Sequence, residues 1–314
     1  MSRSPKANVG DTTLVASVII PSFQSAGTID ACLAAVVGQV AAGPFEIIVA
    51  DSGTDETAEW IARHYPTVRV LKSSTRLDPA LARNWGAREA RGPVLAFIDS
   101  DCVPDPDWLM RLCAALEDGT YSAVGGAIRN GEGATPASWA GYFCEFREFL
   151  PIGAAADATN LTLGNAAYRR TIFDRAGGFP GGYFPQEDQV FHTRLLADGA
   201  RILFDPSIAV THAHRSTVAA FVAHQRRIGA ANARVVSALG LKGAGIASRR
   251  WLAAALLPAL ATYRFARTVA TCWNQERCLM LRHPSIAGLC WLGNLAWSLG
   301  FARPGPDRRQ GRAD

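Results

Sequence analysis

The sequence predicts an α/β fold with a mostly parallel sheet flanked by helices. Residues 94–98 form an unbroken apolar run between Gly92-Pro93 and a stretch rich in acidic residues and proline, which is typical of a strand buried on both faces. Short apolar runs then alternate with helical patterns through the first third of the chain, as they do in a doubly wound parallel sheet. A chain of 314 residues is long enough for one large domain or two modest ones.

Each element of the first third follows from its own apolar pattern and its flanking turn residues. The predicted elements are strands at residues 17–23, 45–51 and 68–71 and helices at 29–40, 57–64 and 79–90. Thr28 is a capping residue type before the first helix, and Asp51 opens a turn sequence before the second. Neither Gly-x-Gly-x-x-Gly nor Gly-Lys-Ser/Thr follows the first strand, which disfavours dinucleotide dehydrogenases and P-loop enzymes.

Asp99 and Asp101 come directly after the strand at 94–98, with Ser100 between them. Ligands of open α/β sheets bind in the crevice outside the carboxyl ends of the strands. Two carboxylates one residue apart can present oxygen ligands to a hard divalent cation, which takes its remaining ligands from water and substrate phosphates. An isolated Asp-x-Asp is also compatible with a solvated acidic turn. The pair therefore indicates a metal site only if other segments of the chain supply the rest of that site.

The pattern changes after residue 110. We predict a strand at 125–129, a helix at 138–150, a strand within 162–170 followed by a helix that ends at Gly177-Gly178, and a strand pair within 202–216. Glu187 and Asp188 open a further helix that stops at Gly199. Carboxylates in a first helical turn are either partners of the helix dipole or, when they face a substrate, proton acceptors.

Four segments together resemble the family 2 glycosyltransferases: Ser17-Val-Ile-Ile-Pro-Ser-Phe, Glu46-Ile-Ile-Val-Ala-Asp-Ser-Gly-Thr-Asp, Ala82-Arg-Asn-Trp-Gly-Ala and Phe97-Ile-Asp-Ser-Asp. The resemblance implies the Rossmann-like GT-A fold and a nucleotide-diphosphate sugar donor. It implies that Asp51 contacts the nucleobase and that Asp99 and Asp101 hold Mg²⁺ or Mn²⁺ on the diphosphate. The other residues that it assigns to the nucleotide sugar are Pro21, Ser22, Phe23, Arg83 and Ser100. The chain departs from the family pattern at Asp78, where a glycine is common.

The resemblance extends to the acceptor side. Glu187-Asp188 is similar to the catalytic pair of the family, which implies that Asp188 is the general base and Glu187 supports it. Gly164 and Asn165 are implied to lie on the acceptor side. His212 matches a position that approaches the metal in several relatives, and His214 is the alternative. The residues alone are equally compatible with histidines at a strand end satisfied by the backbone, and imidazole suits Mn²⁺ better than Mg²⁺.

These patterns divide the chain into three parts. We expect a disordered tail at 1–15, a glycosyltransferase domain at 16–215 with a nucleotide half (16–110) and an acceptor half (111–215), and a basic, apolar helical region at 216–314. From Arg215 onward the chain has 15 Lys and Arg against 3 Asp and Glu, a balance of +12, against −7 for the remainder. The polar N-terminus carries no apolar signal segment.

Two apolar blocks in the last part, 251–263 and 284–302, are flanked by arginines. They predict either buried helices that cap the catalytic domain or a region that lies on, or dips shallowly into, the cytoplasmic face of the cell membrane. We favour the membrane interpretation, and with it a lipid-linked or membrane-delivered acceptor. The positive charge could also attract nucleic acid, but no nucleic-acid-reading module is present in the sequence.

The expected activity is inverting, metal-dependent transfer of a hexose to a glycan or a lipid-linked acceptor in polysaccharide biosynthesis. A UDP-linked donor is favoured, although GDP- and dTDP-sugars are used on the same fold. A nucleotidyltransferase is disfavoured because Pro21-Ser-Phe-Gln-Ser is not a glycine- and lysine-rich loop. A non-catalytic sugar-nucleotide binder or scaffold would be expected to lack Asp188 or one of Asp99 and Asp101, and all three are present.

Overall fold

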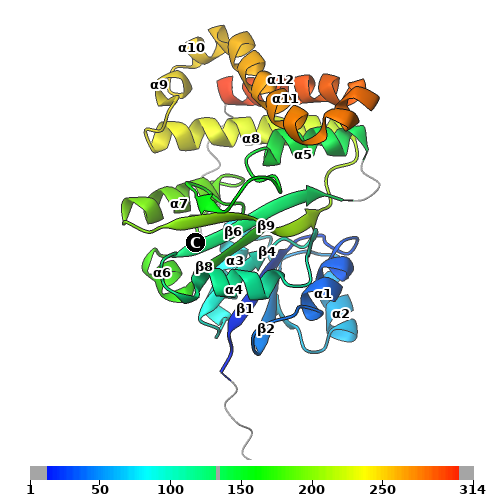
Figure 1. Cartoon of the computed structure of the whole chain (residues 1–314), viewed down its shortest axis with the longest axis vertical. Helices are drawn as coiled ribbons and strands as arrows, with labels where there is room; N and C mark the ends of the chain where they lie inside the picture. The colour runs from blue at the N-terminus through cyan, green and yellow to red at the C-terminus, as the bar shows by residue number, and fades with distance from the viewer. Residues whose placement is uncertain (1–12, 132–134, 304–314) are drawn as a thin grey trace, which may run out of the picture.

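The computed structural model describes residues 13–131 and 135–303, with the side chains of 272 and 274–280 left out of the description. Residues 1–12 of the predicted N-terminal tail lie outside the described part. The fold is α/β, as predicted, and one large sheet runs through its centre in the strand order β3-β2-β1-β4-β8-β6-β9-β5 (Figure 1).

The first four strands of this order are parallel, as the sequence predicts. They are β3 (Arg69–Lys72), β2 (Phe45–Asp51), β1 (Ala16–Ser22) and β4 (Val94–Ile98). The side chains of β1, β2 and β4 are almost all buried, because helices cover both faces of a parallel sheet. Their carboxyl ends therefore meet at one edge, where Asp51 and Asp99 emerge.

Three helices link these strands: α1 (Ile29–Val37), α2 (Thr57–His64) and α3 (Pro79–Glu89). Helix α1 packs its apolar face against the core on one side of the sheet, and helix α3 packs on the other side. Asp78, the departure from the family pattern, caps α3: its Oδ1 accepts a hydrogen bond from the Ala80 N–H at 2.9 Å. Such a cap satisfies one of the free N–H groups of the first helical turn.

The acceptor half makes the sheet mixed. Here β8 (Asn165–Arg169) lies antiparallel between β4 and β6 (Ala123–Asn130). Beyond β6 lies β9 (Ile202–His212), which also pairs with the short strands β5 (Cys102–Pro104) and β7 (Ala156–Asp157). The helices of this half are α4 (Trp108–Glu117), α5 (Pro136–Phe146), α6 (Arg170–Arg175) and α7 (Glu187–Ala197).

The predicted strand pair within 202–216 is wrong. Residues Ile202–His212 form one strand of 11 residues with a break in its pairing to β6 between Gly126 and Ala127. The sequence Asp205-Pro-Ser looks like a turn, and the Asp205 Oδ1 does accept a hydrogen bond from the Ser207 N–H at 2.9 Å. This local structure makes a bulge in one strand, and the chain then continues in the same direction.

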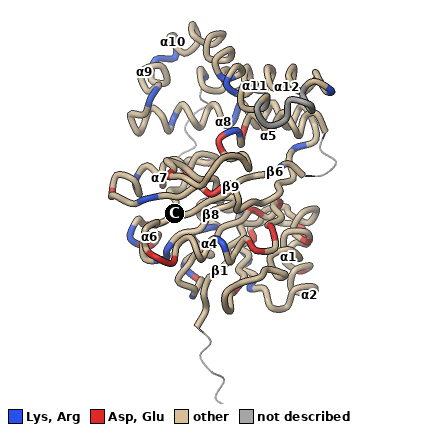
Figure 2. Tube along the Cα trace, in the orientation of Figure 1, with Lys and Arg blue, Asp and Glu red and all other residues tan. Residues whose placement is uncertain are grey.

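The last third forms a helical layer with α5 (Figure 1). Its helices are α8 (Val218–Ala238), α9 (Ala244–Ala247), α10 (Arg250–Ala255), α11 (Leu257–Arg282) and α12 (Pro284–Ala302). Glycines let α8 and α12 meet at backbone distance: a Cβ on Gly229 would lie 1.9 Å from the Trp297 carbonyl oxygen, and one on Gly300 2.0 Å from that of Arg226. Lys and Arg residues occur along the helices of this layer (Figure 2).

Within the described residues, α12 is the one helix with the length and apolar character to cross a bilayer, and 56% of that apolar window is buried inside the protein. The first predicted apolar block, 251–263, is split between α10 and the start of α11. The layer is thus attached to the catalytic domain through α8, α12 and α5, whose apolar side chains join the main core.

Candidate functional site

A cleft of about 1280 Å³ lies between the carboxyl ends of β1 and β4, helix α7 and the C-terminal helical layer. It gathers residues that are up to 276 positions apart, from Pro21 to Trp297. The predicted site residues that line it are Pro21, Ser22, Phe23, Arg83, Asp99, Ser100, Asp101, Gly164, Glu187, Asp188 and His212. Asp51, Asn165 and His214 are not among its lining residues.

Arg83 joins the two halves of the cleft. Its guanidinium is buried and lies between two carboxylates, with Nη2 at 2.6 Å from the Asp99 Oδ1 and Nη1 at 3.0 Å from the Glu187 Oε1. Burial raises the pKa of the Glu187 carboxyl to about 7, and the nearby Arg83 opposes this rise. The arginine therefore fixes Asp99 of the nucleotide half relative to helix α7 of the acceptor half.

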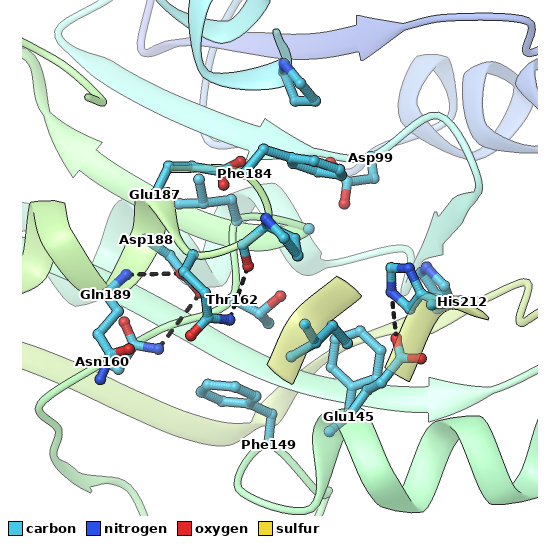
Figure 3. Close-up of a pocket in the computed structure, with 18 of the residues that line it drawn as sticks. Asp99, Glu145, Phe149, Asn160, Thr162, Phe184, Glu187, Asp188, Gln189 and His212 are labelled. Atoms are coloured by element: carbon cyan, nitrogen blue, oxygen red, sulfur yellow. Dashed lines mark hydrogen bonds and ion pairs between the residues drawn. The ribbon is translucent and has the colours of Figure 1, made fainter. Parts of the chain in front are cut away.

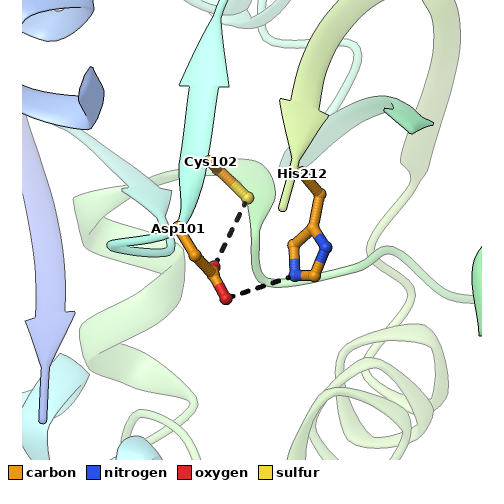
Figure 4. Close-up of side chains that lie close together, drawn as sticks. All are labelled: Asp101, Cys102 and His212. Atoms are coloured by element: carbon orange, nitrogen blue, oxygen red, sulfur yellow. Dashed lines mark hydrogen bonds and ion pairs between the residues drawn. The ribbon is translucent and has the colours of Figure 1, made fainter. Parts of the chain in front are cut away.

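Asp101 lies beside His212, with its Oδ2 at 3.5 Å from the imidazole Nε2, and Cys102 is close to both (Figure 4). Antiparallel pairing of β5 with β9 places Cys102 opposite His212. Burial raises the pKa of the Asp101 carboxyl, His212 lowers it and Asp99 adds to the rise. Burial also raises the pKa of the Cys102 thiol, so the sulfur stays protonated.

This donor set fits a hard divalent cation. Two carboxylates close together repel each other unless a cation lies between them, and the carboxylate–imidazole combination suits Mn²⁺. His212 reaches Asp101, whereas the His214 ring packs behind it at 4.3 Å between centroids. Burial lowers the pKa of His214 to about 3. Gly164 lies against the Asp99 carboxylate, since a Cβ on Gly164 would be 3.1 Å from the Asp99 Oδ2.

Asp188 is held at the start of α7 by two donors (Figure 3). Its Oδ1 accepts a hydrogen bond from the Gln189 N–H at 2.7 Å, and its Oδ2 lies 3.5 Å from the Asn160 Nδ2. Burial raises the pKa of the Asp188 carboxyl to about 6, with the two hydrogen bonds opposing the rise. A carboxylate with this pKa is ionised at neutral pH and still basic enough to accept a proton.

A buried chain of hydrogen bonds through Asn160, His192 and Tyr168 supports Asp188, and no motif in the sequence indicates it. Asn160 contacts Asp188 on one side and the His192 Nδ1 on the other, at 2.6 Å from its Oδ1. The His192 Nε2 then shares a hydrogen bond with the Tyr168 hydroxyl at 2.7 Å. Burial lowers the pKa of His192 to about 3, so the imidazole is neutral and can donate on one side and accept on the other.

Asp51 lies just behind the cleft wall and is fully buried. Its Oδ1 accepts hydrogen bonds from the Ser22 hydroxyl at 2.8 Å and the Gly53 N–H at 3.3 Å. Its Oδ2 pairs with the Lys72 ammonium at 2.7 Å. A nucleobase that contacts this carboxylate has to share it with the half-exposed Lys72.

Asn165, which was predicted to lie on the acceptor side, does not line the cleft, and its buried side chain makes three hydrogen bonds within the fold. Its Oδ1 accepts from the Trp108 Nε1–H at 2.8 Å, and its Nδ2 donates to the carbonyls of Ala127 and Ile208 at 2.9 and 3.0 Å. The asparagine thus ties β8 to β6, to the bulge in β9 and to α4. The neighbouring Gly164 lines the cleft, whereas Asn165 does not.

The helical layer contributes a polar group that the sequence did not single out. Glu145, near the end of α5, is buried beside His224, whose Nε2 lies 3.4 Å from the Glu145 Oε2, and Arg215 lies 3.8 Å from the same oxygen. These partners hold the pKa of the Glu145 carboxyl down at about 2 against the effect of burial. His224, Arg227 and Trp297 also line the cleft, so the helical layer forms one of its walls.

Comparison with known proteins shows which family the sequence resembles. A family model described as Glycosyl transferase family 2 matches residues 17–177. Glycosyltransferase AglE of Haloferax volcanii is 27% identical over 208 residues, which are 63% of this chain and 67% of that protein. Two further curated relatives are much longer, and the chain covers 20% and 25% of their lengths.

Solved structures show the same fold. The mannosyltransferase PcManGT from Pyrobaculum calidifontis, in complex with GDP-Man and Mn²⁺, superposes with a TM-score of 0.59 at 22% identity over 92% of this chain and 86% of that one. TarS 1-349 from S. aureus, in complex with UDP-GlcNAc, gives 0.53 at 20% identity over 69% and 66%. These neighbours confirm the predicted GT-A fold, and since the family model spans just over half of its residues, the chain belongs to glycosyltransferase family 2.

Proposed function

We propose that this glycosyltransferase moves a hexose, with inversion of configuration, from a nucleotide-diphosphate sugar to a hydroxyl of a glycan or lipid-linked acceptor. The observation that carries the proposal is the placement of Asp188 in the same cleft as Asp99 and Asp101. One cleft thus offers a carboxylate pair for the leaving diphosphate and a separate carboxylate for the attacking hydroxyl.

On the donor side, Asp99, Asp101 and His212 would hold Mg²⁺ or Mn²⁺. The bound cation supplies Lewis acidity, which stabilises the negative charge that develops on the diphosphate. Arg83 keeps Asp99 in position through the 2.6 Å ion pair. Pro21, Ser22, Phe23 and Ser100 form the adjacent wall, where the nucleotide would lie.

On the acceptor side, Asp188 accepts the proton of the hydroxyl as its oxygen attacks the anomeric carbon. Inversion requires this carboxylate on the face opposite the leaving diphosphate. The hydrogen bonds from Gln189 and Asn160 fix the carboxylate, and its pKa of about 6 leaves it ionised at neutral pH. Glu187, bound to Arg83, supports the start of the helix that carries Asp188.

The stereochemical outcome tests this proposal. Slow hydrolysis of UDP-glucose, UDP-GlcNAc, GDP-mannose and dTDP-glucose with Mn²⁺ would be followed by proton NMR, which shows the first anomer released. An inverting enzyme releases the opposite anomer from that of the donor, and Asp188→Asn abolishes the reaction. Asp198→Asn, at the exposed far end of the same helix, is the matched control and should keep full activity. Retention of configuration would contradict the proposed role of Asp188.

A UDP-linked donor is the favoured form of the proposal. Asp51 is compatible with uracil, and its carboxylate is held close behind Ser22, next to the cleft. Among the structural neighbours, one was solved with GDP-Man and another with UDP-GlcNAc, so GDP-sugars remain the main alternative. The donor panel above separates these cases.

We also propose that the helical layer rests on the cytoplasmic face of the cell membrane without spanning it. Large aromatic side chains protrude from it, with Trp251 70% and Tyr263 60% exposed, and Arg249 and Arg250 lie next to Trp251. Aromatic and cationic side chains together suit the headgroup region of an anionic leaflet. Co-sedimentation with phosphatidylglycerol vesicles, but not with phosphatidylcholine vesicles, is expected. Equal recovery in the supernatant with both would contradict membrane binding.

A further inference from the structure

Three arginines lie in the wall of the cleft formed by the helical layer: Arg147, just after α5, and Arg264 and Arg267 of α11. Glu148 pairs with two of them, with its Oε1 at 3.2 Å from the Arg147 Nε and 2.5 Å from the Arg267 Nη2. We call these three residues the roof arginines. Their combined charge of +3 meets one carboxylate, which leaves an excess of +2 beside the cleft.

Arg264 has no carboxylate partner within the described part of the chain. Its guanidinium carbon lies 3.7 Å from the centroid of the Trp297 ring, and its Nε is buried without a hydrogen-bond partner among the described residues. Burial, together with the charges of Arg147 and Arg267, lowers the pKa of Arg264 to about 9. Buried arginine nitrogens are usually paired with an anion, so the partly buried Arg264 is suited to binding one.

The chemistry of the roof arginines selects the kind of anion. A guanidinium presents N–H donors in a planar fork that matches a phosphate or carboxylate group. A phosphate monoester carries a charge of roughly −1.5 to −2 at neutral pH, which matches the excess of two positive charges. A single carboxylate would neutralise half of this excess. The Arg264 guanidinium lies over the Trp297 ring, and both residues line the cleft.

We propose that the roof arginines form a subsite for the phosphate group of a phosphorylated acceptor. This inference rests on the proposed function, because it names the chemical class of the acceptor. The phosphate can belong to a diphosphate that links an acceptor glycan to a lipid, or to a phosphate monoester on a free glycan, and each carries a charge of roughly −2. In both cases the roof arginines hold the phosphate while Asp188 receives the hydroxyl proton.

Direct binding tests the subsite without any sugar transfer. Inorganic phosphate and hexyl phosphate would each be titrated into the whole protein by isothermal calorimetry, with EDTA present so that no metal bridges phosphate to Asp99. The variants are Arg264→Gln and Arg267→Gln, and the matched control is Arg282→Gln, an exposed arginine of the same helix outside the cleft. Arg267 is half exposed, so its variant keeps the test valid if Arg264→Gln unfolds.

We expect each roof variant to weaken phosphate binding by about tenfold or more, the size of one charge-assisted hydrogen bond. Binding should be unchanged in Arg282→Gln. Tighter binding of hexyl phosphate than of inorganic phosphate supports a lipid-linked acceptor, and equal binding supports a free phosphorylated glycan.

The subsite is refuted if wild-type protein binds neither phosphate, or if Arg264→Gln and Arg267→Gln both bind phosphate as tightly as the wild type. Nucleotide binding with Mn²⁺, measured on the same variants, is expected to be unaffected by the roof substitutions. If the proposed donor site is wrong, nucleotide binding is absent while phosphate binding remains. If the proposed subsite is wrong, phosphate binding fails while nucleotide binding remains, so the two proposals can be refuted separately.

Discussion

Replacing Asp188 by asparagine should inactivate the enzyme and stabilise its fold. The carboxyl has an ordinary pKa of 3.8, and burial raises it to about 6 in the folded protein. A carboxylate whose pKa is raised by folding opposes folding whenever it is ionised. Asparagine has nearly the same shape and carries no charge, so the substitution removes this opposition together with the proposed base.

The magnitude follows from the difference in pKa. Each pKa unit corresponds to 1.36 kcal/mol, so a rise of about 2 units makes the ionised side chain cost at most about 3 kcal/mol. Between pH 4 and 6 the folded chain binds more protons than the unfolded chain, so stability falls as the pH rises through this window. The full cost is present at pH 8 and absent below about pH 4.

Thermal unfolding of both proteins at pH 8 and pH 4 measures this effect. At pH 8 we expect the midpoint of Asp188→Asn to exceed that of the wild type by about 5 °C, since 1 kcal/mol corresponds to roughly 2–4 °C in chains of 150–250 residues and to less in longer ones. At pH 4 the two midpoints should coincide. Asp198→Asn, exposed at the other end of α7, should change neither midpoint nor activity.

An equal or lower midpoint for Asp188→Asn at pH 8 would refute the claim that the carboxylate is held in a desolvated site. Stabilisation with retained activity would leave the desolvation intact and refute the catalytic role.

Four further predictions follow from the site. The kcat/KM of the wild type should rise with pH through about 6 and then level off, because Asp188 must be ionised to accept a proton; a profile flat from pH 5 to 8 would contradict this. Arg83→Met leaves two carboxylates without their cation and should lower the unfolding free energy by about 3–5 kcal/mol in urea denaturation. Asn165→Leu removes three buried hydrogen bonds and should cost about 2–4 kcal/mol while the kcat of the folded fraction stays the same; a selective loss of acceptor affinity would restore the acceptor role. Gly164→Ala pushes against Asp99 and should weaken Mn²⁺ binding by about tenfold in calorimetry, with unchanged stability.

The strands of the nucleotide half were predictable because their signals are local. Residues 45–51 and 94–98 are apolar runs between turn residues, and both strands have these bounds in the structure. Helix α7 was predictable for the same reason, since Glu187 starts it and Gly199 follows its end with a positive φ. The bulged strand β9 was not, because Asp205-Pro-Ser has the same local chemistry in a turn and in a bulge.

Roles that depend on distant partners could not be predicted. Asn165 packs against Trp108, 57 residues earlier in the chain, and no sequence pattern shows that this indole needs an acceptor. His192 becomes part of the support of Asp188 only because β8 brings the Tyr168 hydroxyl to its ring. A histidine on an apolar helix face looks alike in sequence whether it packs or orients a neighbour.

The packing of the C-terminal helices could not be predicted from the sequence either. Apolar helices that rest on a membrane and helices that pack on a domain share composition and length. Composition also cannot show which contacts the helices make with one another, such as the backbone contact of Gly229 and Gly300 across α8 and α12, because that contact depends on how the helices cross. Arg264 and Trp297 line the cleft because of this crossing, although both lie far along the chain from the nucleotide half.

The measurement that tests the central claim most directly is thermal stabilisation by UDP, GDP and dTDP, each with and without Mn²⁺. A ligand that binds only the folded state stabilises it by about 2.7 kcal/mol at a hundred times its Kd. We predict that one nucleotide raises the unfolding midpoint with Mn²⁺, and that the shift disappears with EDTA and in Asp99→Asn. A folded protein that responds to none of the three, or that responds equally in Asp99→Asn, would contradict the donor site described above.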